Sequence, residues 1–212
     1  MADLEIEKRV AAEAAAELVQ AGQLVGLGTG STVAHLLDAL AARGLDGVRC
    51  VATSPATERR GRELGLHVEP FEGLARLDIA IDGTDQVSPD RWLVKGGGAA
   101  HTREKIVAAA ADRFVVIGSS DKPVDAIGPP VPLELLAYGL DATLHAIGDV
   151  ELRDVPASPD GGVIADYLGL VEDPAALAAR LDSIPGVVAH GLFAPALVSD
   201  VLIARATTVT AL

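Results

Sequence analysis

Aromatic residues, cysteines and positive charge are all scarce in this chain of 212 residues. Phe, Trp and Tyr make up 3% of the sequence, so its core must be built from Ala, Val, Leu and Ile. The single cysteine, Cys50, excludes a framework of disulfides within the chain and is typical of intracellular proteins. A formal net charge of −13 argues against nucleic acid or an anionic membrane as the main partner. We therefore expect a globular cytoplasmic protein.

Long apolar runs and lysines are also lacking. No run could span a bilayer, and the first ten residues carry charges that a signal peptide does not have. The length suits one large domain or two small ones. The lysines are Lys8, Lys95, Lys105 and Lys122. Because ammonium and guanidinium groups are not interchangeable, lysines in an arginine-rich chain are candidates for function, with ordinary surface placement as the alternative.

Short apolar segments alternate with amphipathic segments in the first part of the chain. Strands are expected at residues 24–27, 48–52, 67–71, 77–81 and 114–117, and helices at 4–19, 55–64 and 106–111. Strands that alternate with helices favour a largely parallel sheet with helices on both faces. The sequence therefore predicts an α/β fold with a Rossmann-like sheet.

The pattern changes near Gly128, where Pro129, Pro130 and Pro132 interrupt it. Beyond them we expect helices at 135–147 and 174–184 and strands at 150–155, 163–168 and 186–193. This order is the split β-α-β unit of a smaller α+β subdomain. The expected division is an α/β catalytic domain at 1–128 and 202–212, and the α+β subdomain at 129–201. The run at 201–209 is β-branched and suits a strand that returns to the first sheet.

A turn rich in Gly, Ser and Thr follows the first expected strand, with the sequence G-T-G-S-T at residues 28–32. Backbone N–H groups converge where a strand ends and a helix begins, so such a turn can bind a phosphate. Its spacing matches neither the dinucleotide motif G-x-G-x-x-G nor a P-loop. A tight turn capped by Ser31 or Thr32 is the alternative to a phosphate site.

Acidic, basic and glycine residues concentrate between residues 79 and 105. Asp82 and Asp85 flank a glycine turn, Lys95 leads into three glycines, and Glu104 follows in the first turns of a helix-like segment. Two carboxylates, an ammonium group, a glycine turn and a further carboxylate suit proton transfer on a small anionic substrate. The alternative is structural: Asp82 caps a turn, Lys95 pairs with it, and Glu104 lies on a solvated face.

Metal binding and nucleophilic catalysis find no support in the sequence. The histidines have no metal-ligand spacing, so surface or core positions are expected for His35, His67, His101, His145 and His190. The serines near strand ends lack the His and Asp partners of a catalytic triad. We therefore expect neither a metal nor a covalent intermediate.

The ordered set of motifs resembles the ribose-5-phosphate isomerase A family. The matching blocks are G-x-G-T-G-S-T at 26–32, T-S at 53–54, D-G-x-D at 82–85, K-G-G-G-A-A-x-T-R-E-K at 95–105, Lys122, P-x-P-x-E at 130–134 and I-P-G-V-V-x-x-G-L-F-A at 184–194. A single block would be a weak signal, but these recur in order over nearly the whole length. The resemblance is therefore specific.

The resemblance implies interconversion of ribose 5-phosphate and ribulose 5-phosphate through an enediolate, without metal or cofactor, in the non-oxidative pentose phosphate pathway. It implies that Glu104 is the base, that Asp82 and Asp85 help to open the furanose ring, and that Lys95 stabilises the oxyanion. The substrate-binding positions that it implies are Thr29, Gly30, Ser31, Thr32, Gly83, Thr84, Gly96, Gly97, Gly98 and Lys122. The family also implies a homodimer or homotetramer.

Four residues depart from the usual family pattern. Thr84 and Gln86 replace Ala and Glu in D-G-A-D-E, His101 replaces a common Leu, and Asp121 replaces the Ser before Lys122. The acid–base set is intact, while these changes affect the residues that hold the substrate. The alternatives are a divergent paralogue acting on another sugar phosphate, a non-catalytic sugar-phosphate sensor on the same fold, and a relative of the acyl-CoA transferases, for which the chain is short.

Overall fold

The computed structural model describes residues 2–212, and its internal contacts divide the chain into two compact units. Unit 1 comprises Met1–Thr84, Arg103–Lys122 and Ala196–Leu212, and unit 2 comprises Asp85–Thr102 and Pro123–Pro195. These bounds differ from the division expected at residues 128 and 202. The main reason is that residues 85–102 pack with unit 2, although they lie between two strands of unit 1 in the sequence.

Unit 1 contains a six-stranded sheet with the order β13-β12-β6-β3-β1-β2. Its strands are β1 (Leu24–Leu27), β2 (Arg49–Ala52), β3 (Ile79–Gly83), β6 (Phe114–Ser119), β12 (Asp200–Arg205) and β13 (Thr208–Ala211). Every neighbouring pair is parallel except β12 and β13, which form an antiparallel hairpin. The expected largely parallel sheet is confirmed. All of β6 is buried, as a strand covered on both faces should be.

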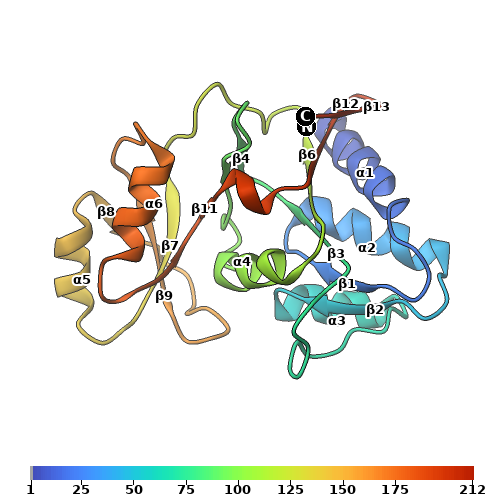
Figure 1. The fold of residues 1–212 in the computed structure, drawn as a ribbon, viewed down its shortest axis with the longest axis horizontal. Helices are drawn as coiled ribbons and strands as arrows, with labels where there is room; N and C mark the ends of the chain where they lie inside the picture. The colour runs from blue at the N-terminus through green and yellow to red at the C-terminus, as the bar shows by residue number, and fades with distance from the viewer. Residues whose placement is uncertain (1) are drawn as a thin grey trace. The chain divides into compact units, whose positions relative to one another are not determined.

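Helices cover both faces of this sheet. They are α1 (Ala2–Ala16), α2 (Ser31–Arg43), α3 (Pro55–Glu63) and α4 (His101–Ala110). Side chains of α1 and α2 form one aliphatic core with Val25 and Leu27 of β1, and the two helices lie side by side (Figure 1). Gly26 faces the opposite side, where a Cβ would lie 2.5 Å from Val107 of α4. No helix within residues 2–212 is long and apolar enough to cross a bilayer.

Unit 2 contains an antiparallel sheet with the order β10-β7-β9-β8 and a small sheet with the order β11-β5-β4. Its strands are β4 (Gln86–Val87), β5 (Leu93–Val94), β7 (Val131–Leu135), β8 (Val150–Leu152), β9 (Val163–Tyr167), β10 (Val187–His190) and β11 (Leu192–Phe193). Helices α5 (Leu140–Ile147) and α6 (Pro174–Asp182) pack on the larger sheet through Ile147, Leu177 and Leu181. The expected α+β arrangement is present in this unit.

Three expected elements differ in the structure. Residues 67–71 form only an isolated bridge from Val68 to Cys50, because Pro70 lacks an N–H and a bend follows. The helix expected at 135–147 begins only at α5, since residues 131–135 form β7 between β9 and β10. The strand expected at 186–193 is divided at Gly191, whose main chain packs so closely that a Cβ would lie 2.2 Å from the carbonyl oxygen of Lys95.

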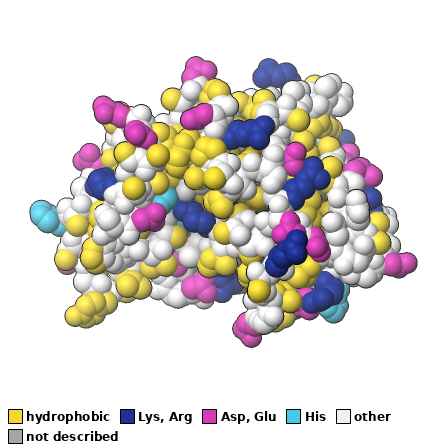
Figure 2. All heavy atoms as spheres, viewed as in Figure 1, with side chains coloured by type: hydrophobic (Ala, Val, Ile, Leu, Met, Phe, Trp, Pro, Cys, Tyr) yellow, Lys and Arg dark blue, Asp and Glu magenta, His cyan; other side chains and the backbone are white. Residues whose placement is uncertain are grey.

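Charged side chains of both signs are interspersed over the molecular face drawn in Figure 2. The net charge of −13 is therefore not gathered into one acidic patch on that face. Many acidic side chains pair with arginine inside unit 1, including Glu58 with Arg62 and Asp38 with Arg60. Such exposed pairs contribute little to stability, typically under about 1 kcal/mol each.

Candidate active site

Asp82 fixes the turn that follows β1 in unit 1. Its side chain is 3% exposed at the end of β3, and Oδ1 accepts hydrogen bonds from the N–H groups of Thr29 (3.1 Å) and Gly83 (2.7 Å). Strands β1 and β3 pair in parallel, so their carboxyl ends lie at the same edge of the sheet. Residue 28 must be glycine, because a Cβ there would lie 1.9 Å from the Asp82 carboxylate. Unit 1 thus brings Asp82 together with the predicted phosphate turn.

A group of hydroxyls orients Thr29. Its Oγ1 lies 2.8 Å from Oγ1 of Thr53 and 3.4 Å from Oγ1 of Thr57. The Thr57 hydroxyl donates to the carbonyl oxygen of Gly28 at 2.9 Å, and the Thr57 N–H donates to Ser54, the N-cap of α3. Thr57 is not among the residues predicted from the sequence. It could have been found as a threonine in the first turn of the helix that follows a strand of the same sheet.

The amino-terminal turn of α2 follows directly. Its N-cap is Gly30, with φ of 132°, a positive value that favours glycine. No side chain in the described part of the chain caps this helix, so the alternative of a turn capped by Ser31 or Thr32 is wrong. Thr32 is buried and Ser31 is exposed. The first N–H groups of α2 therefore have the arrangement that binds anions at helix termini.

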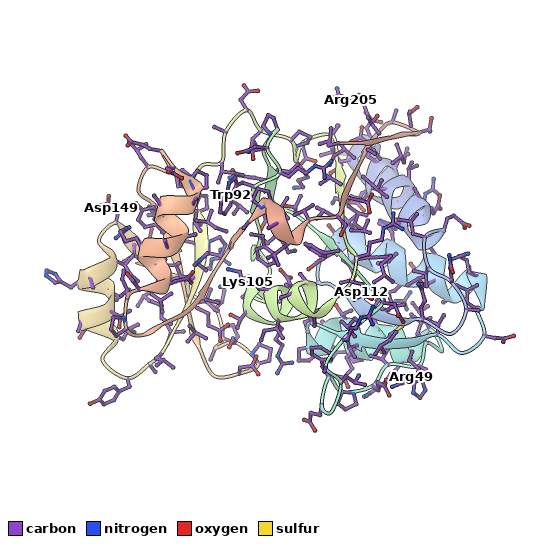
Figure 3. The ribbon with its side chains drawn as sticks, in the orientation of Figure 1. Arg49, Trp92, Lys105, Asp112, Asp149 and Arg205 are labelled. Carbon is purple, nitrogen blue, oxygen red and sulfur yellow. The ribbon has the colours of Figure 1, made fainter. Side chains whose placement is uncertain are left out.

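Glu104 lies in the first turn of α4 and its side chain is only 4% exposed. The alternative that it lies on a solvated face is therefore wrong. Its neighbour Lys105, labelled on α4 in Figure 3, is half-buried, and Asp112 follows the end of that helix. A carboxylate in the first turn of a helix is stabilised by the helix dipole. Helix α4 begins in unit 2 at His101 and continues in unit 1 from Arg103.

Lys122 lies in the loop after β6 and pairs with the residue that precedes it. Its Nζ is 3.1 Å from Oδ2 of Asp121, whose other oxygen accepts a hydrogen bond from the Ser119 hydroxyl. Burial would raise the pKa of Asp121, but the Ser119 hydroxyl and the Lys122 ammonium together lower it below its usual value. The departure noted at residue 121 thus places a carboxylate directly on the predicted substrate-binding lysine.

Glu7 of α1 anchors the same loop. Its buried carboxylate accepts the N–H of Ser120 at 2.8 Å and the N–H of Ala206, in the hairpin turn between β12 and β13, also at 2.8 Å. The hydrogen bonds from Ala206 and Ser120 lower the pKa of Glu7. From the sequence alone, Glu7 is only one of several charged residues near the amino terminus.

Asp85 has the same relation to the glycine turn of unit 2 that Asp82 has to the turn of unit 1. Its Oδ2 accepts the N–H of Gly97 at 2.8 Å, and a Cβ at residue 97 would lie 2.9 Å from Oδ1 of Asp85. Lys95, 2% exposed, precedes this turn, and its Nζ lies 5.4 Å from the centre of the Phe193 ring. Unit 2 therefore holds Asp85, Lys95 and the glycines as one local group.

His101 packs against this turn. It is fully buried, and a Cβ on Gly96, whose φ is 108°, would lie 2.7 Å from its Nδ1. The ring of His101, one of the departures noted in the sequence, thus contacts the main chain of the turn directly. Within residues 2–212, no group of three or more His, Cys, Asp or Glu side chains is arranged to hold a metal ion.

Arg153, which sequence analysis missed, also contacts the glycine turn. It follows β8 and donates from Nη1 to the carbonyl oxygens of Gly96 (2.9 Å) and Gly97 (3.2 Å). Its Nε and Nη2 donate to the two oxygens of Asp166 in β9, each at 2.6 Å. The sequence could have indicated the pair of Arg153 with Asp166, because these opposite charges lie on two consecutive expected strands, at 150–155 and 163–168.

Each predicted site residue thus falls in one of two groups. Unit 1 holds Thr29, Gly30, Ser31, Thr32, Asp82, Gly83, Thr84, Glu104 and Lys122, and unit 2 holds Asp85, Lys95, Gly96, Gly97 and Gly98. Thr84, which is buried, and Asp85 are consecutive residues, so the D-G-T-D motif continues from one unit into the other.

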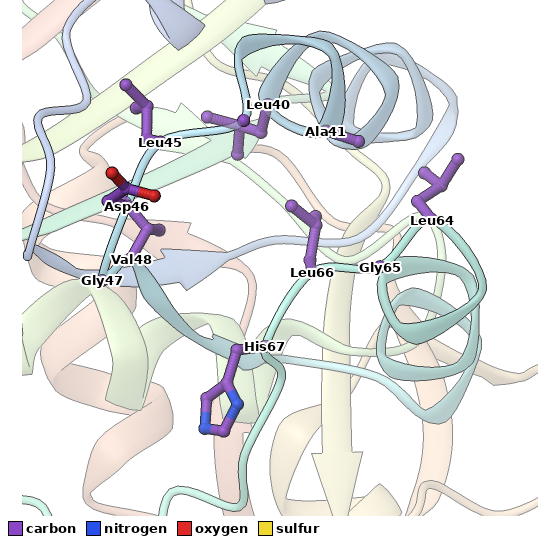
Figure 4. Close-up of a pocket in the computed structure, with 11 residues that line it drawn as sticks. Leu40, Ala41, Leu45, Asp46, Gly47, Val48, Leu64, Gly65, Leu66 and His67 are labelled. Atoms are coloured by element: carbon purple, nitrogen blue, oxygen red, sulfur yellow. The ribbon is translucent and has the colours of Figure 1, made fainter.

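Two cavities in the described residues lie away from these groups. One, of 270 Å³ in unit 1, lies between the ends of α2 and α3 (Figure 4) and is lined by Leu40, Ala41, Gly44, Leu45, Asp46, Gly47, Val48, Leu64, Gly65, Leu66 and His67. The other, of 440 Å³ in unit 2, lies beside Tyr167 and Arg180. Neither is lined by a predicted site residue, so neither is the candidate active site.

Comparisons with known proteins identify a family. Residues 49–208 match the family model described as ribose 5-phosphate isomerase A (phosphoriboisomerase A). The ribose-5-phosphate isomerase A of Halobacterium salinarum is 49% identical over 202 residues, which cover 88% of this chain and 87% of the relative. That of Caulobacter vibrioides is 44% identical over 202 residues, covering 88% of this chain and 89% of the relative.

Solved structures give the same result. Ribose 5-phosphate isomerase A from Neisseria gonorrhoeae matches with a TM-score of 0.94 and 30% identity, covering 99% of this chain and 96% of that chain. The ribose 5-phosphate isomerase of Plasmodium falciparum matches with a TM-score of 0.91 and 30% identity, covering 98% of this chain and 97% of that chain.

Proposed function

Because this chain belongs to the ribose 5-phosphate isomerase A family, we propose that Glu104 is the base of its isomerisation reaction. The enzyme interconverts D-ribose 5-phosphate and D-ribulose 5-phosphate. The reaction needs a group that removes a proton from C2 and returns it to C1, through an enediolate. A single carboxylate can carry that proton between adjacent carbons. The burial of Glu104 supports this role, because a base shielded from water does not exchange its proton before returning it.

Asp82 and Asp85 are the groups that we assign to ring opening and to proton relay between hydroxyls. Each accepts a main-chain N–H of a glycine-rich turn, and this fixes the direction of its second oxygen. Lys95 and the N–H groups of Gly96 and Gly98 are assigned to the oxygen that becomes negative in the enediolate, whereas the Gly97 N–H donates to Asp85. Donors fixed before the reaction stabilise such charge most effectively.

The phosphate of the substrate is assigned to residues 29–32 and to Lys122. The uncapped amino terminus of α2 supports the first assignment. A solved ribose-5-phosphate isomerase in complex with phospho-erythronic acid, with a TM-score of 0.92 to this chain at 30% identity, supports a small phosphorylated ligand. The ion pair with Asp121 weakens the attraction of Lys122 for a phosphate. It does not abolish that attraction, because both side chains are partly exposed and water screens the pair. The sensor and transferase alternatives gain no support from the comparisons.

The deciding experiment is the Glu104→Gln variant. With ribose 5-phosphate in the presence of EDTA, we expect the wild type to form ketose, and we expect kcat of the variant to fall roughly 10²–10⁴-fold, the usual contribution of a general base. Glu13→Gln, an exposed carboxylate of α1, is the matched control and keeps full activity. Full activity in Glu104→Gln would remove this residue from its role, and loss of the wild-type reaction in EDTA would contradict a reaction without metal.

The state of assembly and the location are also proposals. We propose that copies of the chain associate through unit 2, where most of the exposed large apolar side chains of the described residues lie: Leu136, Tyr138, Leu152, Val155, Leu168, Leu170 and Val188. A homodimer or homotetramer would bury these side chains. We propose a cytoplasmic location on the basis of the single, buried cysteine, which leaves no disulfide to form.

A further inference from the structure

Arg153 holds two successive carbonyl groups of the glycine turn in unit 2. One nitrogen, Nη1, donates to the oxygens of both Gly96 and Gly97, at 2.9 and 3.2 Å. The opposite edge of the guanidinium makes a two-point contact with Asp166, and both side chains are more than four-fifths buried. Because Asp166 lies in β9, a strand paired on both sides, the position of Arg153 is fixed by the sheet.

These contacts set the direction of the N–H groups of the turn. In a trans peptide the C=O and the N–H of the next residue point in opposite directions, and both peptide bonds here are trans. A Gly96 carbonyl turned toward Arg153 therefore turns the Gly97 N–H away from it, and this N–H meets Asp85 at 2.8 Å. In the same way, the Gly97 carbonyl on Arg153 directs the Gly98 N–H away from the guanidinium.

Within the turn, the Gly96 carbonyl oxygen also accepts the N–H of Ala99 at 3.0 Å, but the glycines have no side chains that could hold the orientation further. Glycine has no Cβ to restrict its backbone, so this turn loses more conformational freedom on ordering than any other sequence of the same length. The charge-assisted bonds of Arg153 and the Asp85 carboxylate act on opposite sides of the same peptide. The turn is thus braced from outside rather than by its own side chains.

We propose that Arg153, held by Asp166, is a positioning residue that orients the Gly98 amide toward the enediolate oxygen of the substrate, while the Gly97 amide stays on Asp85. The inference rests on the proposed function of the glycine turn as an oxyanion site. Arginine is required because the contacts use three of its nitrogens at once, in the planar arrangement of a guanidinium. A lysine offers one nitrogen and cannot hold Asp166 and the carbonyls together.

The test compares Arg153→Lys and Asp166→Asn with the wild type. We expect Arg153→Lys to lower kcat roughly 10–100-fold, since a displacement of about 1 Å in positioned groups costs up to roughly 10²-fold. KM for ribose 5-phosphate should change by less than about 3-fold, because the phosphate contacts are elsewhere. Asp166→Asn should give a smaller loss, and the double variant no more than Arg153→Lys alone, because Asp166 acts through Arg153. Arg180→Lys, an arginine that also donates to a main-chain carbonyl in unit 2, is the control.

Inhibition constants show whether Arg153 positions the turn or only stabilises the fold in general. Phospho-erythronic acid carries a negative carboxylate oxygen at the end of a phosphorylated chain, whereas inorganic phosphate carries only the phosphate. We expect Arg153→Lys to raise the inhibition constant of phospho-erythronic acid by about the factor lost in kcat, and to leave that of phosphate unchanged. Equal weakening of both inhibitors, or no weakening of either, would overturn the proposal. The ratio of the two inhibition constants measures binding and not proton transfer. Its result is therefore independent of the result for Glu104→Gln. If Arg153→Lys does not fold, Asp166→Asn gives the same comparison.

Discussion

Several carboxylate side chains accept hydrogen bonds from main-chain N–H groups that are distant in the sequence. Asp82 accepts from the turn after β1, Asp85 from the glycine turn and Glu7 from the loop that carries Lys122. The chain has 30 acidic residues and 17 basic ones, so not every carboxylate can pair with a cation. Carboxylates that accept main-chain N–H groups form charge-assisted hydrogen bonds instead. Loops that contain Gly, Ser and Lys are thereby held by side chains from other elements.

Glu7 provides a test of this arrangement through pH. Its pKa is held below the ordinary value of 4.5 by the N–H groups of Ala206 and Ser120. A group whose pKa is lowered on folding stabilises the folded state above its unfolded pKa, and this contribution is lost as the pH falls through the folded value. We therefore expect Glu7→Gln to be less stable than the wild type at pH 7, with the difference shrinking below about pH 4.5.

Urea unfolding of both proteins between pH 3 and pH 8 measures this difference, with Glu13→Gln, an exposed side chain of the same helix, as the control. KM for ribose 5-phosphate should also rise in Glu7→Gln, because the anchored loop carries Lys122. A stability difference that is constant across this pH range would show that the carboxylate charge of Glu7 is not what anchors the loop.

The N-cap of helix α6 allows a prediction about the stability of a single element. Asp173 is the N-cap of α6, and its Oδ1 accepts the N–H groups of Ala175 and Ala176 at 2.9 and 3.2 Å. Replacing such a cap by alanine leaves these donors without their partner and costs about 0.5–2 kcal/mol. We expect Asp173→Ala to lower the free energy of unfolding by about 1 kcal/mol. Glu172→Ala, the exposed neighbouring residue, is the control in denaturant titrations, and equal stability of the two variants would contradict the capping role.

Elements that depend on local pattern were predictable, and contacts between distant residues were not. The apolar run at residues 24–27 is observed as β1 with the predicted bounds, and the glycine turns were identified by their own sequence. Strand β7 was missed because Pro132 lies within it, yet its carbonyl accepts the N–H of Gly191 at 2.7 Å. The contact of Arg153 with Gly96 joins residues 57 positions apart, so no local pattern could predict it.

At the scale of the whole molecule, the charge distribution bears on how an anionic substrate is bound. A net charge of −13 opposes a phosphorylated ligand at long range, but this field is screened within about 8–10 Å at physiological ionic strength. The interspersed charges in Figure 2 also avoid a single acidic surface on the face shown there. We infer that main-chain N–H groups contribute much of the anion binding, because they attract an anion although they carry no net charge.

Assembly is the remaining property at this scale, and the exposed apolar residues of unit 2 make it testable. Tyr138 is 94% exposed and Leu170 is 80% exposed, and they belong to a larger set of exposed apolar residues in unit 2. Such a set, unlike a single exposed leucine, indicates an interface. Burying them between copies would remove apolar surface from water at about 25 cal/mol per Å². We expect light scattering to give two or four times the chain mass of 21.7 kDa, and Leu170→Glu to shift the protein toward smaller species. Leu212→Glu, an exposed leucine of unit 1, should leave the mass unchanged, and a wild type that stays at 21.7 kDa at micromolar concentration would contradict the assembly.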